Sequence, residues 1–169
     1  MNPRAIGLIV VAPIALMALW IGSLAVEVAQ GADVLLPVRG YDPRDILRGH
    51  YVTYQVDYGS KVTRESYDQD PRCVCLEPKG GAVTEATWFG YCADRDAGTC
   101  PLFIRGRSSY QGFLAGIERF YIPEAYSESL RTVPDGATIK VRVARSGRAY
   151  VTEMLVKGEP ILEYAKKQK

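Results

Sequence analysis

The sequence predicts a mainly β (α+β) fold, a small antiparallel sheet or open barrel with one or two short helices, placed behind a single N-terminal transmembrane helix. Residues 5–26 form an uninterrupted apolar run. Short segments of alternating apolar and polar residues follow, and glycine, proline and aspartate separate them. Alternation with period two is typical of half-buried strands, and strands joined by short turns favour antiparallel pairing.

The apolar run predicts a membrane span, because about 20 such residues cross a hydrocarbon core. Arg4 precedes the run, whereas Glu27 and Asp33 follow it, so the positive-inside tendency places the N-terminus in the cytoplasm. We therefore expect an inner-membrane protein with residues 1–4 in the cytoplasm, 5–26 in the membrane, 27–40 as a tether and first strand, and 41–169 as a β-rich periplasmic domain.

A cleaved signal peptide is the alternative for the same run. Residues 23–25, Ser-Leu-Ala, resemble a small-residue cleavage site. The run is longer than the apolar region of about 7–15 residues in signal peptides, and its basic flank is thin. Both interpretations export the remaining chain, so the predicted compartment is the same.

The charge of the exported part argues against nucleic-acid binding. Without Arg4, 20 of the 21 basic residues remain against 19 acidic ones, whereas phosphate binding needs a concentrated basic surface. The basic cluster at the C-terminus, Lys166, Lys167 and Lys169, is expected to be a solvated tail. Neither G-x-G-x-x-G nor a Walker motif occurs, so no nucleotide and no cofactor are expected.

The cysteines predict disulfides, because all four follow the span within one stretch: Cys73, Cys75, Cys92 and Cys100. Four cysteines allow three connectivities. A bond between Cys92 and Cys100 would close the shortest loop, but pairing of Cys73 or Cys75 with that loop is equally reachable. Zinc is the alternative, although the C-x-C and C-x7-C spacings differ from the usual paired C-x2-C; we expect no metal.

The clearest strand is residues 51–58, whose Val52, Tyr54, Val56 and Tyr58 share one face. Before it, Asp42, Pro43 and Gly49 suit the start and end of one or two helical turns. Further strands are expected at residues 34–38, 73–77, 82–92, 101–105, 116–122, 139–143 and 150–156. Residues 124–133 predict a short amphipathic helix, and the turn at 157–158 before Ile161 and Leu162 predicts a β-meander in the C-terminal third.

Three blocks resemble the GDYXXLXY family of single-span bacterial membrane proteins. Residues 37–56, PVRGYDPRDILRGHYVTYQV, are similar to its name-giving region, with His50, Tyr54 and Val56 in place of aspartate, leucine and tyrosine. Residues 116–124, GIERFYIPE, and 140–161, KVRVARSGRAYVTEMLVKGEPI, resemble two further family blocks. The resemblance implies no established activity; such proteins look like accessory partners of multi-span membrane proteins. The cysteine segment is a local addition.

The candidate site residues come from two of these blocks. The first set is expected to form a contact or structural motif: Asp42, Pro43, Arg44, Asp45, Arg48, Gly49, His50, Tyr51 and Tyr54. The second set belongs to the following block: Glu118, Arg119, Phe120, Tyr121, Pro123 and Glu124.

Groups for catalysis are few. His50 is the single histidine, so a serine or cysteine nucleophile has no other histidine as its base. Carboxylates such as Asp42, Asp45, Glu118 and Glu124 would need to converge for hydrolysis. We expect a non-enzymatic accessory protein that docks on a partner integral membrane protein. A periplasmic hydrolase acting through carboxylates and a small-ligand or glycan sensor with a tyrosine-lined groove are the alternatives.

Overall fold

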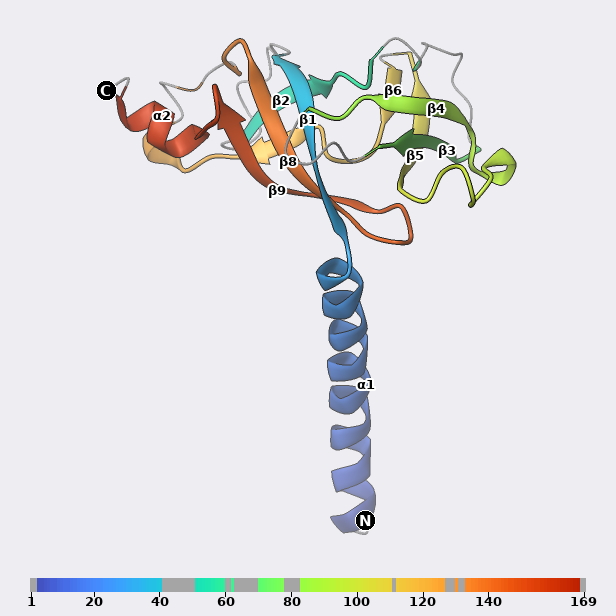
Figure 1. Cartoon of the computed structure of the whole chain (residues 1–169). Helices are drawn as coiled ribbons and strands as arrows, with labels where there is room; N and C mark the ends of the chain where they lie inside the picture. Colours follow the sequence, from blue (N-terminus) through green and yellow to red (C-terminus); the bar gives the residue numbers. More distant parts are fainter. Residues whose placement is uncertain are drawn as a thin grey trace.

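The computed structural model describes residues 3–40, 51–59, 62, 70–77, 83–110, 112–126, 130 and 133–167, with side chains from residue 11 onward. One helix projects from a β domain, and the chain passes from the helix into the middle of a sheet (Figure 1). The predicted fold class, a mainly β domain behind an N-terminal apolar helix, is confirmed.

Helix α1 spans Pro3–Ala29. The part with described side chains, Val11–Ala29, is long and apolar enough to cross a membrane, and none of that window is buried against the rest of the chain. Large apolar side chains such as Leu19, Trp20 and Ile21 are exposed along it. Apolar side chains have a lower free energy in a hydrocarbon core than in water. The composition of this exposed helix therefore favours membrane anchoring.

Two residues separate the end of α1 from strand β1, Ala32–Gly40. The tether is thus shorter than expected and consists of Gln30 and Gly31. The helix continues past Glu27, and the strand starts before residue 34. A Cβ atom at residue 31 would lie 2.8 Å from Cγ of Arg142 and 2.9 Å from the carbonyl oxygen of Val143. Glycine permits this close approach of the connection to the neighbouring strand.

Two antiparallel sheets form the domain. The six-stranded sheet has the order β10-β9-β8-β1-β2-β7 and the other has the order β4-β3-β5-β6. In the first, the new strands are β2 Tyr51–Val56, β7 Arg119–Tyr121, β8 Ala137–Val143, β9 Ala149–Val156 and β10 Glu159–Pro160. The second consists of β3 Arg72–Leu76, β4 Ala86–Tyr91, β5 Phe103–Ser109 and β6 Gly112–Leu114.

One apolar core joins the sheets. Leu36 and Ile139 from the first sheet and Val74 and Ile104 from the second are fully buried and belong to one cluster. The alternation predicted for β8 is confirmed, since its buried residues alternate with Thr138, Lys140 and Arg142. The segment before β4 also bonds to the first sheet, because the Thr84 N–H donates to the carbonyl oxygen of Leu35 at 2.7 Å.

The C-terminus differs from the prediction. After the two-residue strand β10 the chain forms helix α2, Ile161–Lys167, so the meander does not continue through Ile161 and Leu162. Ile161 and Ala165 lie one helical turn apart and are both buried. Lys166 pairs with Glu163 at 2.7 Å and Lys167 with Glu159 at 2.6 Å. Both lysines are exposed, as predicted, although they lie on a helix and form surface ion pairs; Lys169 lies outside the described residues.

Smaller differences concern short elements. Strand β6 was not predicted, and a 3-10 helix, Cys92–Asp94, follows β4. In the predicted amphipathic helix, Glu124–Tyr126 form a 3-10 helix and the Leu130 N–H donates to the carbonyl oxygen of Tyr126 at 3.0 Å. Residues 127–129, 131 and 132 lie outside the described part of the chain.

Asp33 at the start of β1 forms an ion pair that makes stability depend on pH. The Arg142 guanidinium binds both carboxylate oxygens at 2.7 and 2.8 Å and lowers the pKa of Asp33. We predict that Asp33→Asn costs about 0.5–1 kcal/mol of unfolding free energy at pH 7, as expected for a partly exposed pair. Urea titrations of the full chain in detergent, followed by tryptophan fluorescence, measure this difference.

The same variant has a defined pH profile. A lowered folded-state pKa means that the contribution is present above the unfolded-state value near 3.8 and is lost as pH falls through the lower folded-state pKa. Wild type and Asp33→Asn are therefore expected to converge in acid. Glu85→Gln, which changes an exposed carboxylate elsewhere, serves as the control. A difference that persists unchanged below that range would contradict the prediction.

Candidate functional site

Two segments that the sequence analysis singled out lie side by side as neighbouring strands. Strands β2 and β7 pair antiparallel, with Tyr51 opposite Tyr121 and Thr53 opposite Arg119. The Tyr54 N–H donates to the carbonyl oxygen of Glu118 at 3.2 Å, and the Tyr54 hydroxyl donates to that of Ile117. The candidate residues Tyr51, Tyr54 and 118–121 are thus brought together.

The outer face of these strands carries what we call the aromatic edge: Tyr51, Arg119 and Tyr121. The rings of Tyr51 and Tyr121 meet edge to face with centroids 6.0 Å apart, and Cζ of Arg119 lies 5.3 Å from the centre of the Tyr51 ring. Tyr121 is 75% exposed. Tyrosine and arginine are enriched at protein interfaces because they offer apolar area together with hydrogen-bond donors.

The inner face supports the fold. Val52 and Tyr54 are buried, whereas Phe120 is partly buried against the same core. Burial raises the pKa of Tyr54, and the charge of Glu118 adds to this effect. The Tyr54 hydroxyl therefore stays protonated and can donate its hydrogen bond throughout the neutral pH range.

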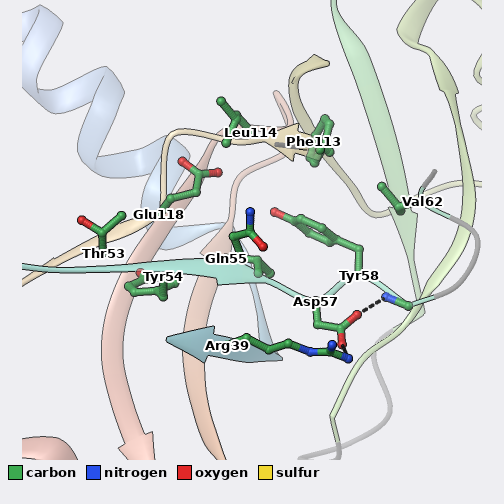
Figure 2. Close-up of a pocket in the computed structure, with 13 residues that line it drawn as sticks. Arg39, Thr53, Tyr54, Gln55, Asp57, Tyr58, Val62, Phe113, Leu114 and Glu118 are labelled. Atoms are coloured by element: carbon green, nitrogen blue, oxygen red, sulfur yellow. Dashed lines mark hydrogen bonds and ion pairs between the residues drawn. The ribbon is translucent and has the colours of Figure 1, made fainter. Parts of the chain in front are cut away.

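Next to this inner face lies a cavity of about 260 Å³ between β2, β6 and the turn before β7 (Figure 2). Its polar lining includes Gln55, Tyr58 and Glu118, and Phe113 contributes apolar surface. The Glu118 carboxylate accepts hydrogen bonds from the backbone N–H groups of residues 115 and 116 at 2.6 and 3.0 Å. The protein thereby fixes the position of one negative charge in the cavity wall.

Asp57 supplies a second carboxylate to the lining of the cavity, beside Arg39 and away from Glu118 (Figure 2). Arg39 binds one of its oxygens at 2.7 Å, and the Gly59 N–H donates to the other at 3.0 Å. Asp57 is thus charge-balanced by Arg39, whereas Glu118 forms no ion pair among the described residues and is held by backbone N–H groups alone.

Tyr58 is the most unusual residue of the cavity. Its hydroxyl is buried and makes no hydrogen bond within the described part of the chain. Figure 2 shows this hydroxyl pointing toward the side of the cavity that holds Gln55 and Glu118. Burial raises the pKa of Tyr58 well above its ordinary value, and Glu118 contributes. A polar group within the cavity would satisfy this protonated hydroxyl, since buried polar groups are normally hydrogen-bonded.

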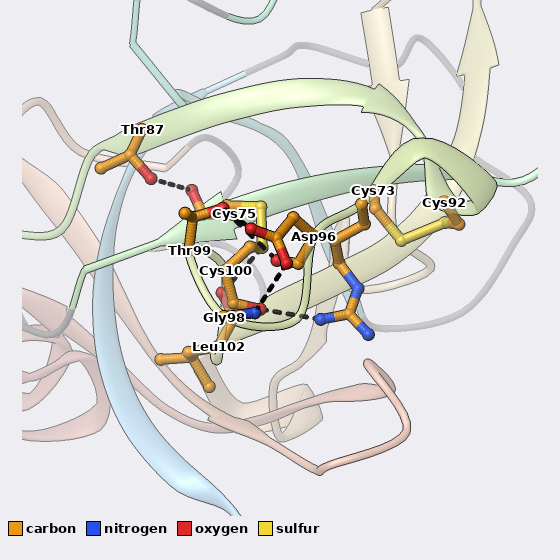
Figure 3. Close-up of a disulfide and its surroundings, with 10 residues drawn as sticks. Cys73, Cys75, Thr87, Cys92, Asp96, Gly98, Thr99, Cys100 and Leu102 are labelled. Carbon is orange, nitrogen blue, oxygen red and sulfur yellow. Dashed lines mark hydrogen bonds between the residues drawn. A yellow bond between two sulfur atoms is a disulfide. The ribbon is translucent and has the colours of Figure 1, made fainter.

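The four cysteines form two disulfides, Cys73 to Cys92 and Cys75 to Cys100 (Figure 3). The short closure between Cys92 and Cys100 is therefore not formed; both sulfurs of β3 instead reach the segment after β4. Within that segment Asp96 accepts hydrogen bonds from the Gly98 N–H at 3.0 Å and the Thr99 hydroxyl at 3.1 Å, and these bonds lower its pKa.

The remaining candidates divide into two groups. Pro123 and Glu124 lie at the bend after β7, where the Pro123 carbonyl accepts a hydrogen bond from the Tyr126 N–H at 3.0 Å. The others lie outside the described residues: Asp42, Pro43, Arg44, Asp45, Arg48, Gly49 and His50. Among the residues that the structure describes, no group of three or more His, Cys, Asp or Glu is placed to hold a metal ion.

A comparison with protein families decides the identity of the chain. The family model described as GDYXXLXY protein matches residues 13–154, which include most of α1, strands β1 to β8 and most of β9. The chain belongs to the GDYXXLXY family. No curated protein and no solved structure matches it. The family has no established molecular function, so the geometry of this GDYXXLXY protein must support any proposal.

Sequence reasoning missed the cavity in this GDYXXLXY protein. The alternation in residues 51–58 correctly predicts that Val52, Tyr54 and Tyr58 are buried, whereas Val56 is only partly buried. A tyrosine hydroxyl on a buried face was the available signal, because it requires a polar partner. The Tyr54 hydroxyl finds this partner in the Ile117 carbonyl of the turn before β7, whereas the Tyr58 hydroxyl faces the cavity without one. The proximity of that turn depends on the pairing of β2 with β7.

Two buried tyrosines offer a matched test. Tyr54→Phe removes the donor to the Ile117 carbonyl and is expected to cost about 1–2 kcal/mol of unfolding free energy. Tyr58→Phe removes a hydroxyl without a protein partner and is expected to change it by less than about 0.5 kcal/mol. Urea unfolding of the full chain in detergent measures both. An equal loss for Tyr58→Phe would show that this hydroxyl is already satisfied.

The disulfide pairing can be tested with double variants. Cys73→Ala/Cys92→Ala and Cys75→Ala/Cys100→Ala each remove one bond and are expected to leave no thiol that reacts with maleimide after denaturation. Each is expected to cost about 2–4 kcal/mol, because the bonds close loops of 19 and 25 residues. The mismatched variant Cys73→Ala/Cys100→Ala is expected to expose two thiols. Reactive thiols in a matched variant would disprove the pairing.

Proposed function

We propose that this GDYXXLXY protein is a non-enzymatic accessory protein of the cytoplasmic membrane whose periplasmic domain docks on a partner integral membrane protein. The supporting observation is the direct passage from α1 into β1 through two residues. Because so short a connection gives the domain little freedom, a span in the bilayer holds it at a defined height above the membrane.

The aromatic edge is the docking surface in this proposal. It lies on β2 and β7, and β7 is the last strand on its side of the six-stranded sheet. Tyr121 is largely exposed, while its contact with Tyr51 limits the rotamers available to both rings. Side chains that are already ordered lose little conformational entropy on binding, so this arrangement suits a protein interface.

The compartment follows from two features of the chain. Two disulfides favour an oxidising environment such as the periplasm. Arg4 before the span and Glu27 after it favour a cytoplasmic N-terminus. Both features support a domain on the periplasmic side of the inner membrane.

Binding of a small polar ligand is a second candidate function, and the cavity favours it. The buried Tyr58 hydroxyl and the fixed Glu118 carboxylate line the same space of about 260 Å³. A ligand hydroxyl could accept a hydrogen bond from Tyr58 and donate one to Glu118. Since both Asp57 and Glu118 are held by protein donors, the lining supports binding rather than hydrolysis by paired carboxylates.

Purification from native membranes in mild detergent tests the docking proposal. We expect a stoichiometric integral membrane protein to accompany the C-terminally tagged wild type and to be identified by mass spectrometry. Tyr121→Ala is expected to weaken its retention roughly tenfold, as for a tyrosine at the centre of an interface. The control is Tyr110→Ala, because Tyr110 is 81% exposed and lies at the turn between β5 and β6.

The possible outcomes separate the two functions. Retention of the partner by Tyr110→Ala and its loss from Tyr121→Ala would support docking through the aromatic edge. Equal retention by both variants would place the interface elsewhere. A wild-type protein that purifies alone would overturn the accessory function and favour ligand binding in the cavity.

A further inference from the structure

We propose that the turn between β8 and β9, residues 144–148, binds anionic phospholipid headgroups through Arg145 and Arg148. We call it the arginine turn. The inference rests on the part of the proposed function that places α1 in a membrane, and it is independent of any protein partner.

The height of the turn follows from the length of the span. Residues 5–26 extend over roughly 33 Å as a helix, close to the thickness of a hydrocarbon core. Glu27 is the first charged residue after this run and still belongs to α1. Its carboxylate therefore lies in the headgroup layer when the run spans the bilayer.

The arginine turn lies at the same height as Glu27. The Ser146 hydroxyl donates a hydrogen bond to a carboxylate oxygen of Glu27. In Figure 1 the turn that joins β8 and β9 extends on the side of the domain from which α1 leaves. Arg145 immediately precedes Ser146, and Arg148 follows it by two positions, so both arginines lie beside the headgroup layer.

The charges of both arginines are available to a ligand. Arg145 and Arg148 are exposed and form no ion pair within the described residues. Arg142, the neighbouring basic residue on β8, is instead engaged by Asp33. Guanidinium groups bind phosphate through paired hydrogen bonds, so two free arginines at this height match the phosphodiester of an anionic lipid.

Other charged groups around the turn leave it basic. Lys140 and Arg142 both face Asp33 and outweigh its charge. Arg105 on β5 adds an exposed cation, and its backbone N–H donates to the carbonyl oxygen of Gly147 at 2.8 Å. Glu27 is the carboxylate that contacts the turn directly, and one negative charge does not balance the three arginines.

The turn is held rigidly enough to present the arginines. The Ala144 N–H donates to the carbonyl oxygen of Arg148 at 2.8 Å, and the Gly147 N–H donates to that of Ala144 at 2.9 Å. Gly147 has a φ of +83°, and a Cβ atom there would collide with the ring of Phe103. Contacts with both α1 and β5 thus fix the turn, which lowers the entropy lost on lipid binding.

Fluorescence quenching of the full chain in phospholipid vesicles tests this inference. The chain has two tryptophans; Trp20 lies in α1 and Trp88 on β4 of the domain. Bromine atoms on lipid acyl chains therefore quench Trp20 selectively. Trp20 is about 10 Å along the helix from Glu27, so lipids beneath the arginine turn pass close to it. Brominated phosphatidylglycerol is compared with brominated phosphatidylcholine.

We expect wild type to select phosphatidylglycerol over phosphatidylcholine roughly fivefold next to Trp20, as expected when arginines contact an anionic surface. Arg145→Gln/Arg148→Gln is expected to reduce this selectivity to about one. Arg107→Gln/Lys157→Gln, which removes the same charge from β5 and the turn before β10, is expected to retain it.

Each other outcome overturns the proposal in a recognisable way. Equal quenching of wild type by both lipids would show that no anionic lipid is selected. Unchanged selectivity in Arg145→Gln/Arg148→Gln would assign it to other residues. Absence of quenching by either lipid would overturn the membrane span itself, and with it the anchoring part of the proposed function.

Discussion

The connection between α1 and β1 is the constraint on which the rest of the molecule depends. Only Gln30 and Gly31 separate the helix from a strand that has partners on both sides, β8 and β2. Gly31 allows this close passage because a side chain there would collide with Arg142. The strand that leaves the helix is thus also the strand around which the six-stranded sheet is built, and the orientation of the sheet follows that of the helix.

The second sheet packs on the first and is further stabilised by two disulfides. It joins the first through shared apolar core residues and the hydrogen bond from Thr84 to Leu35. Its edge strand β6 is only three residues long. Both disulfides fall here and tie β3 to the segment after β4. Cross-links restrict the unfolded chain, so they compensate for the modest area that such short strands can bury.

The sequence predicted the features that depend on neighbouring residues alone. The alternation in β8 and the buried positions Val52, Tyr54 and Tyr58 follow from a period of two, and the apolar helix follows from composition alone. Strand β6 and helix α2 were missed because three residues show no period and the small side chain of Ala165 gives a weak helical signal. The disulfide pairing and the cavity beside Tyr58 depend on which strands meet, and no local pattern contains that information.

The arginine turn and the aromatic edge occupy different parts of one sheet, and this separation links the two proposals. A single span fixes the height of a domain but leaves the helix free to tilt. A second contact with the membrane at Arg145 and Arg148 would restrict that tilt, because the turn is bonded to both α1 and β5. Strand β7 lies three strand positions from β8, about 14 Å across the sheet. The height of Tyr121 above the bilayer would then be set by the lipid contact, and a partner in the same membrane would meet the aromatic edge already oriented for binding.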